Sequence, residues 1–288
     1  MEEKFFRSPA THVGQVNINV TDLDRSLAFY QEVVGFNVLE KSGNTVSLTA
    51  DGSRPLLTIV EPEGALPKEE RKTGLFHFAI LLPSRSDLSS FLTHLIKSGQ
   101  TLQLGASDHH VSEALYFNDP DGNGIEVYRD RPSGEWEWSG GKVKMVTEPL
   151  NGDSLVAESD REWHGLPQKT VMGHIHLHVA NLTDAEVFYK HGLGFDIVTT
   201  YPGALFISTA GYHHHIGLNI WNGEGAGKPS TNSAGLRWYS LVFPDGKARQ
   251  EAVDRLEQAE FNVEKAGDAY RVEDPSGNKI HLIVEHTK

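Results

Sequence analysis

The chain has 288 residues, of which 38% are hydrophobic and 23% are charged; this balance is typical of a globular protein and excludes a disordered or fibrous one. Lysine and arginine total 26 against 39 acidic residues, and the resulting net charge of −13 disfavours nucleic acid or an anionic membrane as a partner. Cysteine is absent, which excludes disulfides and thiolate chemistry and leaves the 15 histidines and the acidic residues as the natural metal ligands.

No apolar run reaches the roughly 18–20 residues that span a membrane. The N-terminus, residues 1–6, lacks the apolar stretch of a secretion signal. We therefore expect a soluble, cytoplasmic protein without a membrane partner.

The first predicted elements form a strand, a helix and further strands. Residues 16–20 alternate apolar and polar side chains, which predicts a half-buried strand. Thr21 is expected to cap a helix that carries an apolar stripe and ends at Gly35. Strand signals follow at 45–49 and 56–60.

A second cycle follows the same order. A strand is predicted at 76–82, and a helix at 88–97 ends at Gly99. Strands return at 114–117 and, after an Asp-Pro-Asp-Gly turn, at 124–129. Each cycle therefore has the order βαβββ.

The second half of the chain repeats the landmarks of the first. Residues 20–36 and 179–195 share Val, Leu, Phe-Tyr and Gly-Phe at one spacing, and Asp-Pro-x-Gly-Asn begins at both Asp119 and Asp274. A weaker pair joins 74–83 to 235–244. Repeats in one order indicate a shared architecture, so the whole chain is predicted to contain four βαβββ modules.

The stretch between the halves loses this periodicity. We expect an N-terminal domain at 1–130, a connector at 131–168 and a C-terminal domain at 169–288. The connector carries Trp136, Trp138 and Trp163. Tryptophans are rare in free linkers, which favours a connector that packs against a domain.

The helix pattern Leu-x-x-(Ser/Ala)-x-x-Phe-Tyr and the Asp-Pro-x-Gly-Asn motif resemble the vicinal oxygen chelate superfamily. That superfamily includes glyoxalase I, the bleomycin and fosfomycin resistance proteins and the type I extradiol dioxygenases. The resemblance implies an α+β fold with two tandem domains of two modules each, whose mixed, curved sheets form metal-binding cups. In the superfamily the ligands lie on the first and last strands of a module.

His77 and Glu126 occupy those positions in the second module, and His174 occupies the first-strand position of the third. The equivalent positions of the first and fourth modules look degenerate, with Gln15, Trp238 and His281. Two histidines and one carboxylate meet in one cup only if module two faces module three, which is the pairing we favour. They would then form a 2-His-1-carboxylate triad for Fe(II), and Mn(II) accepts the same ligands.

The resemblance also implies catalytic residues beside the triad. Tyr116 precedes Glu126 by ten residues in Tyr-Phe-x-Asp-Pro-x-Gly-Asn-x-x-Glu, as in type I extradiol dioxygenases. His214 is in register with a histidine of that family, with His215 as the alternative. His109, in the pair His109–His110, lies in the region of a further family histidine, although its spacing to Tyr116 is shorter.

The implied function is extradiol (meta) cleavage of catechol or a small substituted catechol, with a small aromatic diol and O2 as partners and self-association left open. A glyoxalase-type metal-dependent isomerase or lyase is the first alternative, but it needs a second carboxylate where this chain has leucine at 56–57. A metal-free small-molecule-binding resistance protein is the second, although it would not need a complete triad. Each selected residue also has a structural interpretation, as a core histidine, a packed strand tyrosine or a solvated loop residue.

Overall fold

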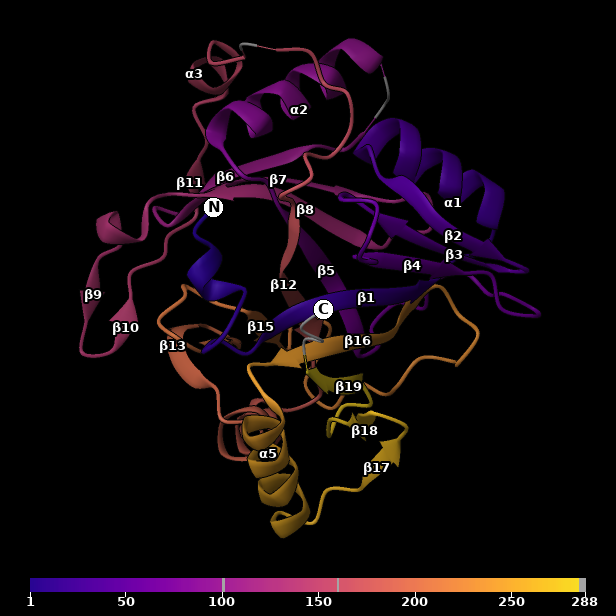
Figure 1. Ribbon diagram of the computed structural model, residues 1–288, viewed down its shortest axis with the longest axis vertical. Helices are drawn as coiled ribbons and strands as arrows, with labels where there is room; N and C mark the ends of the chain where they lie inside the picture. Colours follow the sequence, from indigo (N-terminus) through magenta and orange to yellow (C-terminus); the bar gives the residue numbers. More distant parts are fainter. Residues whose placement is uncertain (100–101, 160, 285–288) are drawn as a thin grey trace.

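The computed structural model describes residues 1–99, 102–159 and 161–284, and these contain the four expected βαβββ modules (Figure 1). The first module comprises β1 (His12–Asn19), α1 (Leu23–Phe29) with a π-helical turn (Tyr30–Val34), β2 (Asn37–Ser42), β3 (Thr45–Thr49) and β4 (Leu57–Val60). The second comprises β5 (Gly74–Leu81), α2 (Arg85–Ser98), β6 (Gly105–Asp108), β7 (Ser112–Asn118) and β8 (Gly124–Asp130).

The second half of the chain repeats this order. The third module comprises β12 (Val171–His178), α4 (Leu182–Glu186) with a π-helical turn (Val187–Gly192), β13 (Asp196–Tyr201), β14 (Ala204–Ser208) and β15 (Ile216–Asn219). The fourth comprises β16 (Gly235–Phe243), α5 (Gly246–Gln258), β17 (Val263–Ala266), β18 (Ala269–Glu273) and β19 (Lys279–Val284). Among the described residues, no helix has the length and apolar character that crossing a membrane requires.

Each of the two large sheets combines a module from each half of the chain. The nine-stranded sheet has the order β11-β6-β7-β8-β5-β12-β15-β14-β13, and the eight-stranded sheet has the order β17-β18-β19-β16-β1-β4-β3-β2. The central pairs β5–β12 and β1–β16 are both antiparallel. The expected pairing of module two with module three is therefore confirmed, while the domain boundaries at 130 and 169 stay a prediction.

The alternation of β12 shows how the sequence positions the cup. Ile175 and Leu177 are fully buried in the main hydrophobic core, which also contains Phe188 of the π-helical turn that follows α4. Because successive strand side chains point to opposite faces, His174 and His176 lie on the other face, toward the concave side of the sheet. In Figure 1, α1 and α2 lie at the top and α5 at the bottom, with the sheets between them.

The helix ends correct one expectation and confirm another. Asp22, and not Thr21, caps α1, because its carboxylate accepts a hydrogen bond from the backbone N–H of Arg25. The Thr21 hydroxyl instead donates to Asp121. The predicted stop at Gly99 is confirmed, since Gly99 is the C-cap of α2 with a φ of 66° that favours glycine.

Within the first two modules, β2 and β6 lie outside the ranges that the sequence predicted. β2 is exposed along most of its length, and β6 is exposed or half-buried throughout. Neither has a buried face, so neither shows the alternation that identifies a half-buried strand.

The connector between the halves packs against the modules, as expected. The Trp136 ring stacks on Phe5 with centroids 5.4 Å apart, and Trp163 lies 5.0 Å from Phe91, whereas Trp138 remains 39% exposed. The connector contains a turn of 3-10 helix (Ser133–Glu135), β9 (Trp138–Ser139), β10 (Lys142–Val143), β11 (Glu148–Pro149) and α3 (Gly152–Val156). β11 pairs antiparallel with the edge strand β6 and so extends the nine-stranded sheet.

Buried histidines make the fold sensitive to acid. His215 is fully buried; its Nε2 donates to the Phe5 carbonyl at 2.9 Å and its Nδ1 accepts from the Thr209 N–H at 3.3 Å. Burial lowers the pKa of His215 to about 3 and that of His12 to about 4. Since the unfolded chain takes up these protons near pH 6.5 and the folded chain does not, stability is lost as pH falls below about 6.5.

We predict that the free energy of unfolding of the wild type decreases between pH 6.5 and 4, with each such histidine contributing about 1.4 kcal/mol per pH unit. The His215→Gln variant should be less stable at pH 7 but show a shallower decrease, measured by urea unfolding at several pH values. His164→Gln, at an exposed histidine, should keep the wild-type slope. An equal slope in His215→Gln and the wild type would contradict this origin of the acid sensitivity.

Candidate active site

Three buried side chains meet on the concave face of the nine-stranded sheet. His77 comes from β5, Glu126 from β8 and His174 from β12. The Nε2 atoms of His77 and His174 lie 3.1 Å and 3.0 Å from the same Glu126 oxygen, Oε2, and the three potential ligand atoms lie within 4.8 Å of one another. The structure thus brings together the three residues that the sequence selected as metal ligands.

Strand register explains why these side chains converge. Ala79 lies between Glu126 on one side and His174 on the other, on three adjacent strands. Gly124 lies opposite His77, and a Cβ at Gly124 would approach the Phe76 carbonyl oxygen to 2.1 Å. Small residues at these two positions leave room for the larger ones beside them.

The protonation states suit metal binding. Burial opposes ionisation of Glu126, but the contacts with His174 and His77 outweigh burial and hold the pKa of the carboxyl well below its usual range. Burial lowers the pKa of His174, which keeps its imidazole neutral. A carboxylate and neutral imidazoles are the forms that ligate metal ions. The Nε2 of His77 is buried without a well-formed hydrogen bond, as expected of a ligand atom facing an ion.

Tyr116 and His109 form a hydrogen-bonded pair in the wall of the same pocket. His109 Nδ1 lies 2.6 Å from the Val146 carbonyl, which can only accept, so Nδ1 carries the proton. His109 Nε2 is then free to accept from the Tyr116 hydroxyl at 2.7 Å. Burial and the negative charge of Glu126 raise the pKa of Tyr116 well above its usual value, so the phenol stays protonated.

In each pair of candidate histidines, the burial and the direction of the side chains show which member faces the pocket. His214 lines the pocket, whereas the alternative, His215, is turned away toward Phe5. His109 also lines the pocket, whereas His110 is partly exposed and pairs with Glu148 at 3.2 Å. The structure therefore places His214, Tyr116 and His109 in the pocket that contains the triad, and their catalytic roles stay predictions.

The pocket has a volume of about 300 Å³ and is mostly apolar. Its walls include residues that the sequence analysis did not select, namely Phe76, Val111, Met145, Val146, His176, Tyr201, Phe206 and Trp221. The His176 imidazole accepts a hydrogen bond from the Asn219 amide at 2.9 Å. Met145 and Val146 belong to the connector, and no periodic signal in the sequence placed the connector at the pocket.

Known proteins are similar to this chain in sequence. The family model described as Glyoxalase/Bleomycin resistance protein/Dioxygenase superfamily matches residues 12–127 and again residues 171–282. A protein named catechol-2,3-dioxygenase, from Bacillus subtilis (strain 168), is 45% identical over 280 residues, which is 95% of this chain and 98% of that protein.

Solved structures agree on the fold. A putative dioxygenase from Bacillus subtilis superposes with a TM-score of 0.69 at 11% identity, over 96% of this chain and 86% of that one. Glyoxalase I from Zea mays superposes with a TM-score of 0.58 at 15% identity, over 95% and 92% of the two chains. The chain therefore belongs to the glyoxalase, bleomycin resistance protein and dioxygenase superfamily.

We predict that the metal-free protein binds one equivalent of Fe(II) or Mn(II) under anaerobic conditions, measured by calorimetry and by the rise in melting temperature. Glu126→Gln should weaken binding by more than the roughly 10- to 100-fold that follows loss of a residue outside the ligand set. His178→Gln alters a histidine on the same face of β12 and serves as the matched control, with near wild-type binding. Unchanged affinity in Glu126→Gln would contradict the proposed ligand set.

Proposed function

We propose that this member of the superfamily is an extradiol dioxygenase, which cleaves the ring of catechol or a small substituted catechol beside its two hydroxyl groups. It would use O2 at a non-haem Fe(II) centre held by His77, Glu126 and His174. The observation that carries the proposal is the convergence of these three ligand atoms within 4.8 Å at an apolar pocket. The 45% identity to a protein named catechol-2,3-dioxygenase supports the choice of reaction.

The ligand set fits a reaction that needs open coordination positions. Two imidazoles and one carboxylate occupy one side of an ion and leave positions for both a diol and O2. When bound, Fe(II) would lower the pKa of the diol as a Lewis acid and supply electrons for oxygen chemistry. Mn(II) accepts the same ligands, so the choice between the two ions belongs to the proposal.

The remaining polar residues of the pocket would accept and donate protons. His214 would accept a proton from a diol hydroxyl, since a neutral imidazole suits a general base near neutral pH. The Tyr116 hydroxyl would turn its single proton away from His109 Nε2 and donate it to an oxygen atom on which negative charge develops. The apolar wall excludes water, which strengthens these interactions.

Two alternatives use the same fold. A glyoxalase-type isomerase or lyase needs a second carboxylate as a base, whereas Glu126 is the single carboxylate among the described residues that line the pocket. A metal-free binding protein would have no use for a complete triad with a buried carboxylate between two histidines. Both observations favour the dioxygenase.

We expect oxygen uptake and a yellow ring-fission product when the protein is reconstituted with Fe(II) anaerobically and then given catechol and air. His174→Ala should abolish both signals, and Tyr116→Phe should lower kcat by about 10²-fold through loss of one donor. His178→Gln is again the control with near wild-type activity. Product formation that survives His174→Ala would contradict the ligand set. One bound metal without oxygen uptake from any catechol would favour the metal-dependent isomerase or lyase.

The pocket wall also bears on substrate choice. The described lining contains neither lysine nor arginine, and it includes Met145, Phe206 and Trp221. A carboxylate on the ring would be buried there without a partner, which is strongly unfavourable. A methyl group would gain apolar contact instead.

We therefore predict that kcat/KM for 4-methylcatechol exceeds that for 3,4-dihydroxybenzoate by about 10²-fold or more, because an unpaired buried charge costs several kcal/mol. Introducing a cation with Met145→Arg should reduce this ratio. Comparable values of kcat/KM for the two substrates in the wild type would contradict an apolar wall as the source of specificity.

A further inference from the structure

Behind His214 lies a chain of buried polar groups that the proposed chemistry has not used. His214 Nδ1 lies 2.8 Å from His213 Nδ1, and His213 Nε2 lies 2.8 Å from Asp130 Oδ1. The His213 side chain is completely buried and that of Asp130 is 5% exposed.

The direction of each hydrogen bond follows from what each atom can do. The Asp130 carboxylate only accepts, so His213 Nε2 carries the donated proton. In neutral His213 the other nitrogen, Nδ1, is then an acceptor. The proton shared by the two Nδ1 atoms must therefore come from His214. A neutral His214 with its proton on Nδ1 has a lone pair on Nε2, the ring nitrogen left for the pocket.

We propose that Asp130 and His213 are positioning residues that fix the tautomer of His214, so that His214 presents an unprotonated Nε2 to the pocket. Neither residue touches the substrate in this assignment. Both act through His214, in the way that a buried carboxylate orients a catalytic imidazole in other enzymes.

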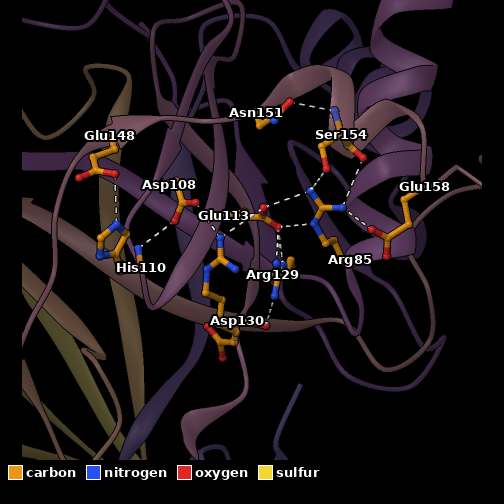
Figure 2. A network of polar contacts seen from close by, with 11 residues as sticks. Arg85, Asp108, His110, Glu113, Arg129, Asp130, Glu148, Asn151, Ser154 and Glu158 are labelled. Atoms are coloured by element: carbon orange, nitrogen blue, oxygen red, sulfur yellow. Dashed lines mark hydrogen bonds and ion pairs between the residues drawn. The ribbon is translucent and has the colours of Figure 1, made fainter. Parts of the chain in front are cut away.

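Neighbouring residues hold Asp130 in the position from which it accepts the hydrogen bond of His213. The Tyr212 hydroxyl donates to both carboxylate oxygens at 3.1 and 3.2 Å, and the Tyr128 hydroxyl lies 2.8 Å from that of Tyr212. The Asp130 backbone carbonyl accepts from Arg129 at 3.2 Å, and Arg129 is itself bound to the buried Glu113 (Figure 2). Asp130 is therefore fixed at both its side chain and its backbone.

The ring of His213 is equally constrained. It packs against Trp136 and Tyr212, with ring centroids 5.1 Å and 4.1 Å away. These rings, together with Phe5, belong to a second hydrophobic cluster that is separate from the main core. An imidazole enclosed in this way cannot rotate to exchange its two nitrogens without disturbing the cluster.

The consequence for catalysis rests on the proposed function. A diol hydroxyl would lose its proton to His214 Nε2: the O–H bond breaks, an N–H bond forms, and the electron pair stays on oxygen. The imidazolium that results keeps its Nδ1–H bond to His213, and the Asp130 carboxylate behind His213 stabilises the positive charge. With the opposite tautomer, Nε2 would already carry a proton and could not act as the base.

The first test reads the tautomer directly, without metal or substrate. In the metal-free protein labelled with ¹⁵N-histidine, two-bond ¹⁵N–¹H spectra should show His214 protonated at Nδ1 and unprotonated at Nε2, with His214→Gln identifying its signals. In Asp130→Asn the new amide can donate to His213 Nε2. His213 would then donate from Nδ1, and His214 would carry its proton on Nε2.

The second test uses kinetics of the Fe(II)-loaded enzyme. Asp130→Asn should lower kcat by about 10²-fold or more, the range of general acid–base catalysis, with a much smaller change in KM and in Fe(II) affinity. Asp196→Asn makes the same change at an exposed position of β13, in the same sheet, and is the matched control, which should keep both the tautomer and kcat.

Protonation of His214 at Nε2 in the wild type would overturn the inference, as would an Asp130→Asn variant with unchanged tautomer and kcat. The two tests also separate this inference from the proposed function. If no catechol is cleaved, the proposed reaction fails, but the wild-type spectra still decide whether Asp130 and His213 fix the tautomer.

Discussion

The antiparallel pairing of β5 with β12 is the contact on which the rest of the site depends. His77 and His174 are 97 residues apart in sequence numbering (174 − 77), and this pairing places them on neighbouring strands of one sheet. Ala79 lies between Glu126 and His174 in the register, so the two larger side chains meet above a methyl group. A bulkier side chain at this buried position would separate the carboxylate from the imidazole.

The eight-stranded sheet has the same strand arrangement but carries other residues at the positions of His77, Glu126 and His174. Gln15, at the position equivalent to His174, donates its amide to the Thr58 hydroxyl at 2.7 Å. Trp238 stacks on His281 with ring centroids 4.1 Å apart. The polar groups there bond one another or stack, whereas those of the nine-stranded sheet converge on one carboxylate oxygen. The two cups differ in side chains and share a backbone plan, which is why fold alone does not identify the function.

Much of this architecture could be predicted, because local periodicity and repeated motifs indicate its strands, helices and modules. The strands with one buried face, the helix that stops at Gly99 and the four modules all follow from such patterns. The strands β2 and β6 could not be predicted, because exposure on both faces removes the alternation. Thr21 and Asp22 are both good capping residues, and the presence of Asp121 beside Thr21, a contact distant in sequence, decides between them.

The site residues also fall into those that the sequence could predict and those that it could not. The strand positions that hold ligands in the superfamily predicted the triad, and the requirement that its three members share one cup predicted the pairing of modules. The choice between His109 and His110, or between His214 and its neighbours, depended instead on partners far along the chain. Val146 fixes the proton of His109 from the connector, and Asp130 reaches His213 across 83 residues. No periodicity encodes such contacts.

Proton positions link these observations to chemistry. The polar chains that start at His109 and at His214 both end at a group that can only accept: the Val146 carbonyl behind His109, and the Asp130 carboxylate behind His213. An acceptor at the far end determines the tautomer at the near end, because a neutral imidazole carries one proton. The pocket thus holds a phenol that donates toward His109 and, on the tautomer we infer, an imidazole that accepts. These two acceptors, the Val146 carbonyl and the Asp130 carboxylate, decide which atoms at the pocket can take a proton and which can give one.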